Sequence, residues 1–242
     1  MINRDARVYW VNASAMWRAL EPAARTENGC LRVDLPTVTR FLVTRPVSLE
    51  FIAGIVAGAP RDRALVVEDL MHEDVAPVDD VRVFRIPVML RAAGAVTPPT
   101  IRVTEVTDAR ELAETERLMV EQFPLRAYQP LVTGNGLPPR VLDLPGWRVW
   151  LARDDDGTPA AACFTYDDGV AVGFYWVVTH PEHRGRGLGR AVMETALAAH
   201  PDRVATLIAT EDGQPLYEKL GFRTVSTMTW YTRQSVIDAR NV

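Results

Sequence analysis

The sequence predicts an α/β (α+β) protein, in which a smaller α+β unit precedes a domain built on a mixed, mostly antiparallel sheet flanked by helices. The chain has 242 residues, 48% of them hydrophobic, which suffices for one large or two small packed domains. Three β-rich runs between Trp147 and Val178 are separated by Asp-Gly pairs, a strong short-range hairpin signal. A helical repeat then begins at Leu188, and a short apolar strand follows it.

The charge balance and the cysteine content exclude several classes of protein. Lys and Arg total 27 against 31 Asp and Glu, so the net charge of −4 has the wrong sign for binding a phosphate backbone. Cys30 and Cys163 form no metal-ligand spacing, and so few cysteines fit a reducing compartment. The longest strongly apolar run, 51–59, is far shorter than the roughly 20 residues of a membrane span. We therefore expect a cytoplasmic protein with no metal and with neither nucleic acid nor a membrane as partner.

Residues 1–96 are expected to form the smaller unit and 97–242 the larger one. The boundary falls in Arg91–Thr100, where small residues, a glycine and two prolines indicate a linker. Apolar residues at helical spacing behind the candidate cap Asn12 predict one helix, and Ser48 precedes a second. Strands are expected at Val38–Val43, Ala64–Val67 and Val81–Leu90.

In the larger unit, the sequence marks the starts and ends of helices and strands more clearly. Ile101 and Val103 are expected to open a strand. Thr107-Asp108 with Glu111 forms a cap and partial capping box for a helix that Pro124 ends. Residues 125–146, rich in proline and glycine, predict a loop. Three sequential antiparallel strands are expected at Trp147–Arg153, Pro159–Tyr166 and Val170–Val178.

The last part of the chain predicts a strand–helix–strand crossover. The helix begins at Leu188, and the apolar strand Val204–Ala209 should lie parallel to the strand before it, because such crossovers are right-handed. A further helix is expected at Gln214–Leu220, with Gly221 at its C-terminal end. Phe222–Tyr231 can then form the closing strand.

One stretch indicates chemistry. Val177–Ala191, VVTHPEHRGRGLGRA, joins a strand to a helix and contains the pattern RxxGxG, formed by Arg184, Gly187 and Gly189. Glycines let a backbone approach a ligand closely, and the amides of Gly185–Arg190 lie at a helix N-terminus that carries about half a positive charge. The stretch therefore predicts a pyrophosphate-binding site formed by the amides of Gly185–Arg190, the anion seat.

Other glycine-rich loops fit less well. A P-loop ends in Gly-Lys-Ser/Thr, which is absent here, and a dinucleotide fingerprint reads GxGxxG, whereas Gly185, Gly187 and Gly189 give GxGxG. The RGRG sequence alone does not make a basic RNA-binding surface in an acidic protein.

Together with GQPLYEKLGF at 213–222, this motif resembles the signature of the GNAT superfamily, the acyl-CoA-dependent N-acyltransferases. The resemblance covers Ile101 to about Tyr231. It implies a sheet splayed between the strand ending at Val178 and the strand at Val204–Ala209, with acetyl-CoA in the opening. The residues that would contact this co-substrate are Val177, Val178, Thr179, Arg184, Gly185, Arg186, Gly187, Leu188, Gly189, Arg190 and Thr210. Residues 1–96 resemble, more faintly, the degenerate GNAT-like unit of some tandem members.

The resemblance also assigns catalytic roles. Tyr217 matches the general acid of the family, although a tyrosine that packs on Phe222 would occupy the same position. A backbone amide, that of Val178, would stabilise the oxyanion. The strand GFYWVV at 173–178 lacks the glutamate that serves as base in many relatives. Glu211 and Asp212 are alternatives, although acids at a helix start are common.

Three further polar positions, His180, His183 and Cys163, have structural interpretations that weigh more than the functional ones, whereas Thr210 is expected to contact the cofactor. His180 and His183 are loop histidines beside the phosphate seat, and either could relay a proton. Thr210 replaces the Asn that relatives often use to hold the pantetheine arm. Cys163 has no paired histidine, which favours a buried core residue over an acyl-accepting nucleophile and hence direct attack in a ternary complex.

Three functions remain open on the sequence. The first is an N-acetyltransferase acting on a primary amine of a small molecule. The alternatives are an acyl-CoA-binding sensor or assembly subunit without turnover, and a transferase of a longer acyl group. The sequence leaves the amine acceptor and the oligomeric state open.

Overall fold

The computed structural model describes residues 4–122 and 126–234, whose strands form one continuous 11-stranded sheet. The strands lie in the order β1-β2-β3-β4-β11-β5-β10-β9-β8-β7-β6. Their bounds are β1 Arg25–Glu27, β2 Cys30–Asp34, β3 Val38–Val43, β4 Ala64–Asp69, β5 Arg82–Arg91, β6 Val103–Glu105, β7 Trp147–Arg153, β8 Pro159–Asp167, β9 Ala171–Thr179, β10 Val204–Ile208 and β11 Arg223–Arg233. The helices are α1 Arg4–Leu20, α2 Leu49–Gly58, α3 Ala109–Gln122, α4 Leu188–Ala198 and α5 Gln214–Lys219, with 3-10 turns η1 Arg126–Tyr128, η2 Pro139–Leu142 and η3 Pro181–His183.

The predicted fold class is confirmed. Two strand pairs are parallel, β3 with β4 and β9 with β10, and the other pairs among the described residues are antiparallel. The three strands β7, β8 and β9 match the predicted runs closely, and Gly157 and Gly169 in the turns between them have φ of 82° and 90°. Positive φ is the reason that Asp-Gly pairs mark such turns.

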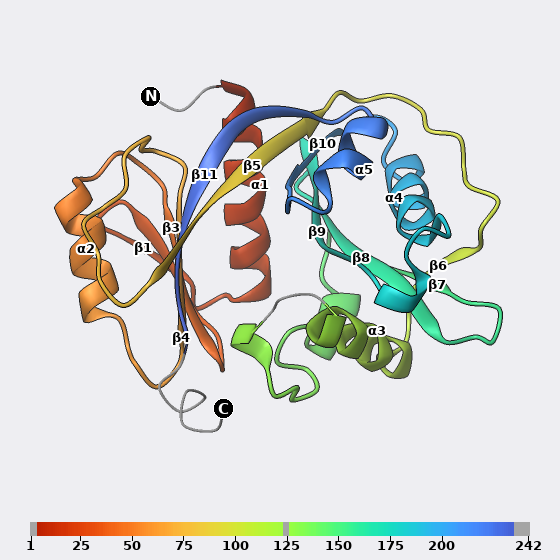
Figure 1. Cartoon of the computed structure of the whole chain (residues 1–242), viewed down its shortest axis with the longest axis horizontal. Helices are drawn as coiled ribbons and strands as arrows, with labels where there is room; N and C mark the ends of the chain where they lie inside the picture. Colours follow the sequence, from red (N-terminus) through yellow and green to blue (C-terminus); the bar gives the residue numbers. More distant parts are fainter. Residues whose placement is uncertain (1–3, 123–125, 235–242) are drawn as a thin grey trace.

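The two predicted units share the sheet. The closing strand β11 lies between β4 and β5, and β5 pairs with β10, so residues on either side of position 96 are joined by strand pairing. In Figure 1, β5 and β11 run between the half that carries α2 and the half that carries α4 and α5. The division at 96/97 stays a prediction about domain organisation. Two short strands that precede β3, β1 and β2, were not predicted from the sequence.

The prediction that Asn12 caps the first helix is wrong. Helix α1 begins at Arg4, and Asn12 lies in its middle with a fully buried side chain. The apolar repeat starts earlier than the cap suggested, at Ala6, Tyr9 and Trp10. A buried asparagine in mid-helix needs partners outside the helix, since its own backbone is already paired.

Helices cover both faces of the C-terminal half of the sheet. Side chains of α1 and α3 pack with Phe164 and Tyr175 in one hydrophobic core, whereas α4 and α5 pack with Cys163 and Phe174 in another. Predicted caps at α2 and α3 are confirmed: Ser48 Oγ accepts from the amide of Phe51, and Asp108 Oδ1 accepts from the amide of Glu111. Pro124 lies outside the described residues. Within the described ranges, no helix is both long and apolar enough to cross a membrane.

Candidate functional site

The sheet opens between β9 and β10. These parallel strands pair from Ala171 with Val204 to Gly173 with Thr206, and there the pairing ends. Strand β9 continues to Thr179, while β10 stays paired with β5 as far as Ile208. The second half of β9 therefore presents an unpaired edge to the opening, as the predicted splay requires.

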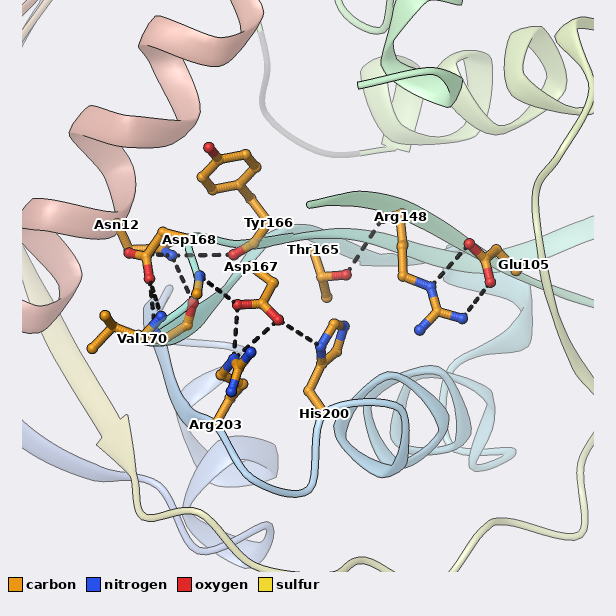
Figure 2. A network of polar contacts seen from close by, with 12 residues as sticks. Asn12, Glu105, Arg148, Thr165, Tyr166, Asp167, Asp168, Val170, His200 and Arg203 are labelled. Atoms are coloured by element: carbon orange, nitrogen blue, oxygen red, sulfur yellow. Dashed lines mark hydrogen bonds and ion pairs between the residues drawn. The ribbon is translucent and has the colours of Figure 1, made fainter. Parts of the chain in front are cut away.

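Polar contacts clamp the closed end of this opening. Asp167, at the end of β8, accepts from Nε of Arg203 at 2.9 and 3.1 Å, and its Oδ2 lies 3.5 Å from Nδ1 of His200. Both partners come from the turn between α4 and β10, as Figure 2 shows. Burial lowers the pKa of His200, and the charge of Asp167 partly offsets that effect. The clamp holds the start of β10 against the β8–β9 hairpin.

A β-bulge lies on β9 beside the opening. Tyr175 pairs with Phe164 and Val178 pairs with Ala162, so Trp176 and Val177 together face the single residue Cys163. Trp176 has a φ of 47°, a left-handed conformation that is strained for a bulky residue. Bulges re-aim backbone groups next to active sites.

The hydrogen-bond pattern between β8 and β9 determines which amides of β9 face the opening. The amide of His180 donates to the carbonyl of Ala160, which makes their pair a hydrogen-bonded one. Such pairs alternate along an antiparallel ladder, so the Val178 amide is directed at Ala162 of β8. Neighbouring amides of an extended strand point to opposite edges, so we infer that the amides of Val177 and Thr179, on either side of Val178, are turned away from β8.

The loop from Gly185 to Arg190 offers six consecutive backbone amides. Among the described residues, none accepts a hydrogen bond from these six N–H groups, whereas the next amide, that of Ala191, donates to Gly187. Gly185 and Gly187 have φ of 77° and 84°, and Gly187 precedes the 11-residue helix α4. A row of free amides at a helix N-terminus attracts an anion.

Gly189 lets this loop pack tightly against β9. A Cβ at Gly189 would lie 2.5 Å from Oγ1 of Thr179, far closer than any stable contact. The first turn of α4 therefore sits directly on the last residue of β9. In this way the fold brings the predicted anion seat to the unpaired edge of the strand.

The three loop arginines point into solvent. Arg184, Arg186 and Arg190 are exposed, and Arg190 Nε forms a 2.8 Å ion pair with Glu194 one helical turn away. Arg186 lies 3.4 Å from Nδ1 of His183, whose Nε2 is 3.4 Å from Asp154. Their positive charges lie around the loop, and Arg186 and Arg190 also contact these neighbouring side chains.

Tyr217 lies in α5 on the same side of the sheet as α4. Its side chain is buried, its ring packs edge-on against Phe222 at 6.1 Å, and burial followed by the nearby Cys163 thiol raises its pKa. Among the described residues, none hydrogen-bonds to its hydroxyl. This environment is compatible both with packing on Phe222 and with the predicted role as general acid.

The remaining predicted positions differ in exposure and in their hydrogen bonds. Thr210 is exposed, and its Oγ1 accepts from the amide of Gly213 at 3.2 Å; Glu211 and Asp212 are exposed just before α5. His180 Nδ1 accepts from the amide of Glu182 within its own turn. Cys163 is fully buried, and burial raises its pKa, which suppresses the thiolate that a nucleophile would need.

The face of β9 opposite α4 and α5 packs aromatic rings against Tyr128, and a buried ion pair of β3 and β4 interacts with the same tyrosine; neither contact was predicted from the sequence. Trp176 packs against Tyr128 at 5.2 Å and against Phe164 at 5.5 Å. Arg40 of β3 and Glu68 of β4 form an ion pair that is almost fully buried, and Arg40 also interacts with Tyr128. The sequence does not indicate that these residues meet, because Tyr128, Trp176 and the paired strands β3 and β4 lie far apart along the chain. No group of metal-ligating side chains exists within the described part of the chain.

Comparison with known proteins identifies the domain that holds the anion seat. A family model described as an acetyltransferase (GNAT) domain matches residues 145–224, which include β7 to β10, α4 and α5. This segment is a GNAT domain. No curated protein matches the whole sequence significantly.

Solved structures share the fold of the GNAT domain together with the segment before it. A GCN5-related N-acetyltransferase from Kribbella flavida aligns with a TM-score of 0.65 and 18% identity over 98% of this chain and 99% of that one. A GNAT-family protein from Novosphingobium aromaticivorans aligns with a TM-score of 0.58 and 19% identity, covering 94% and 99%. A Staphylococcus epidermidis protein of unknown function gives 0.64 and 10% identity, covering 88% and 94%. At these identities the likeness shows the fold of the whole chain and nothing of its substrate.

Proposed function

We propose that the protein is a cytoplasmic N-acetyltransferase, which transfers an acetyl group from acetyl-CoA to a primary amine of a small molecule by direct attack. The observation that carries the proposal is a row of six amides, Gly185–Arg190, that donate to none of the described residues and lie against the edge of β9 that no described strand pairs. Two free, buried cysteines agree with a reducing compartment.

The residues at the opening fit coenzyme A. The free amides and the positive end of α4 suit a diphosphate, and three exposed arginines add attraction. The unpaired edge of β9 offers backbone donors and acceptors to an extended amide chain such as pantetheine, with Val177 and Thr179 as the residues turned towards it. When bound, acetyl-CoA supplies the activated acyl group.

Two groups of this chain are assigned to the transfer. We place the amide that stabilises the oxyanion at Val177 rather than at Val178, because the ladder directs the Val178 amide to β8. Tyr217 stays protonated at neutral pH, since its pKa is raised, and it can donate to the departing sulfur. A raised pKa also makes tyrosinate costly, so Tyr217 should accelerate the reaction without being indispensable.

The acceptor amine must arrive neutral. Strand β9 carries no carboxylate, and Glu211 and Asp212 are exposed. We assign deprotonation of the amine to solvent. The rate at low acceptor concentration should then rise tenfold per pH unit up to the pKa of the acceptor amine, as expected when one proton is lost before the reaction.

Calorimetry with acetyl-CoA, followed by thiol release over a panel of amines, tests the proposal. Binding together with thiol release from at least one amine supports the acetyltransferase. Binding without release from any amine favours the acyl-CoA sensor, and tighter binding of a longer acyl-CoA favours a transferase of that group. Gly187→Glu places an anion in the phosphate seat and should abolish binding; unchanged affinity would falsify the loop assignment.

A further inference from the structure

Helix α1 packs against strands of both halves of the sheet, β2 to β4 on one side and β8 and β9 on the other. On one face of this helix, Tyr9 interacts with Glu68 of β4, and one turn later Asn12 contacts the β8–β9 hairpin. Figure 2 shows Asn12 reaching from α1 to the end of that hairpin. The polar groups of a fully buried side chain need partners, and here strands far along the chain supply them.

All the polar atoms of Asn12 are used. The two hydrogens of its Nδ2 are shared among three acceptors: the carbonyl of Tyr166 at 3.1 Å, Oδ2 of Asp168 at 3.0 Å and the carbonyl of Ala171 at 3.1 Å. Its Oδ1 accepts from the hydroxyl of Tyr175 at 2.7 Å. One side chain thus joins both strands of the hairpin to the N-terminal helix.

Asn12 also lies at the vertex of the opening. A Cβ at Gly173 would lie 2.1 Å from Oδ1 of Asn12, so the asparagine sits directly over the residue whose pairing with Thr206 is the last between β9 and β10. Two residues further, Tyr175 is the last residue before the strained Trp176. The hydrogen bond between Tyr175 and Asn12 therefore fixes β9 between the vertex and the bulge.

We propose that Asn12 is a positioning residue for the transfer reaction: through Tyr175 it holds the bulge of β9 so that the Val177 amide faces the opening. This inference rests on the proposed function, and it gives the segment before the GNAT domain a role in the chemistry. Without this link the strand can relax towards an unstrained Trp176, which moves the amide assigned to the oxyanion. The anion seat, held by Gly189 against Thr179, should not move.

The variant Tyr175→Phe removes only the hydroxyl and keeps the ring stacked on Phe164 at 5.2 Å. We expect kcat to fall about tenfold or more, because small misplacements at a reacting centre have large effects on rate. The dissociation constant of acetyl-CoA should stay within about twofold, because this interaction is needed in the transition state and not for binding. Tyr166→Phe is the matched control: none of the described residues hydrogen-bonds to the Tyr166 hydroxyl, so kcat should stay near that of the wild type.

Amide hydrogen exchange supplies a readout that does not depend on activity. Tyr175→Phe and Asn12→Ala should both speed exchange in a peptide covering 172–179, while Tyr166→Phe should not. Equal losses of cofactor affinity and kcat, or unchanged kcat and exchange in Tyr175→Phe, would overturn the inference. If the wild type does not bind acetyl-CoA at all, the proposed function fails, and the exchange data alone then decide whether Asn12 orders the strand.

Discussion

The contact between Gly189 and Thr179 makes the sharpest quantitative prediction. In Gly189→Ala, the new methyl group would start 2.5 Å from Oγ1 of Thr179. An ordinary contact needs about 3.4 Å, so the first turn of α4 must move away from β9 by roughly 1 Å. That shift is enough to break a hydrogen bond of normal length between a loop amide and a phosphate oxygen.

The expected loss follows from one such bond. A hydrogen bond to a charged group contributes about 1.5 to 3 kcal/mol. Its loss should raise the dissociation constant of acetyl-CoA roughly 10- to 150-fold. Overpacking adds a loss of stability of about 1 to 3 kcal/mol. Isothermal titration calorimetry measures the first quantity and chemical denaturation measures the second.

A second substitution tests the cause. Thr179→Ala removes the oxygen that the new methyl group would strike, and it leaves the backbone of Thr179 available to the ligand. In the double variant we expect most of the lost affinity to return, a coupling that independent sites would not show. Wild-type affinity in Gly189→Ala, or no recovery in the double variant, would refute the reasoning.

Three further outcomes are expected. Tyr217→Phe should lower kcat about 100-fold and leave acetyl-CoA affinity unchanged, because only the proton donor is lost; wild-type kcat would remove Tyr217 from the mechanism. Gly54→Ala should stabilise the protein by about 0.5 to 1 kcal/mol in thermal or chemical denaturation, since Gly54 lies inside α2 and its Cβ would meet nothing within 4 Å. Because burial lowers the pKa of His200, the unfolded state binds its proton first as pH falls. The stability of the wild type should therefore drop below about pH 6.5, by at most about 1.4 kcal/mol per pH unit. His200→Gln should show a flatter curve, and parallel curves for the two proteins would contradict the assignment.

Local signals in the sequence predicted the helices and strands of the GNAT domain closely. Asp-Gly turns need positive φ, and a helical repeat that follows β-rich runs is readable without any tertiary knowledge; β7 to β10 and α4 accordingly lie where they were expected. The free amides at Gly185–Arg190 were predictable for the same reason, because a glycine-rich helix start is a property of adjacent residues; that they bind an anion stays a prediction.

The pairing of strands that are distant in the sequence could not be predicted. The insertion of β11 between β4 and β5 joins residues about 150 positions apart, and no local pattern indicates it. Asn12 shows the same limit: asparagine is a common helix cap, and only the meeting of α1 with the β8–β9 hairpin explains a buried asparagine in mid-helix. The bulge at Trp176 was equally hidden, because it depends on the register with β8.

The central claim is that the amides of Gly185–Arg190 bind the diphosphate of acetyl-CoA. An NMR titration of 15N-labelled protein with coenzyme A tests it most directly, since each amide reports its own hydrogen bond. The account predicts large downfield shifts for several of these six amides, together with shifts at Val177 and Thr179. Shifts confined to another surface, with these resonances unmoved at saturation, would contradict it.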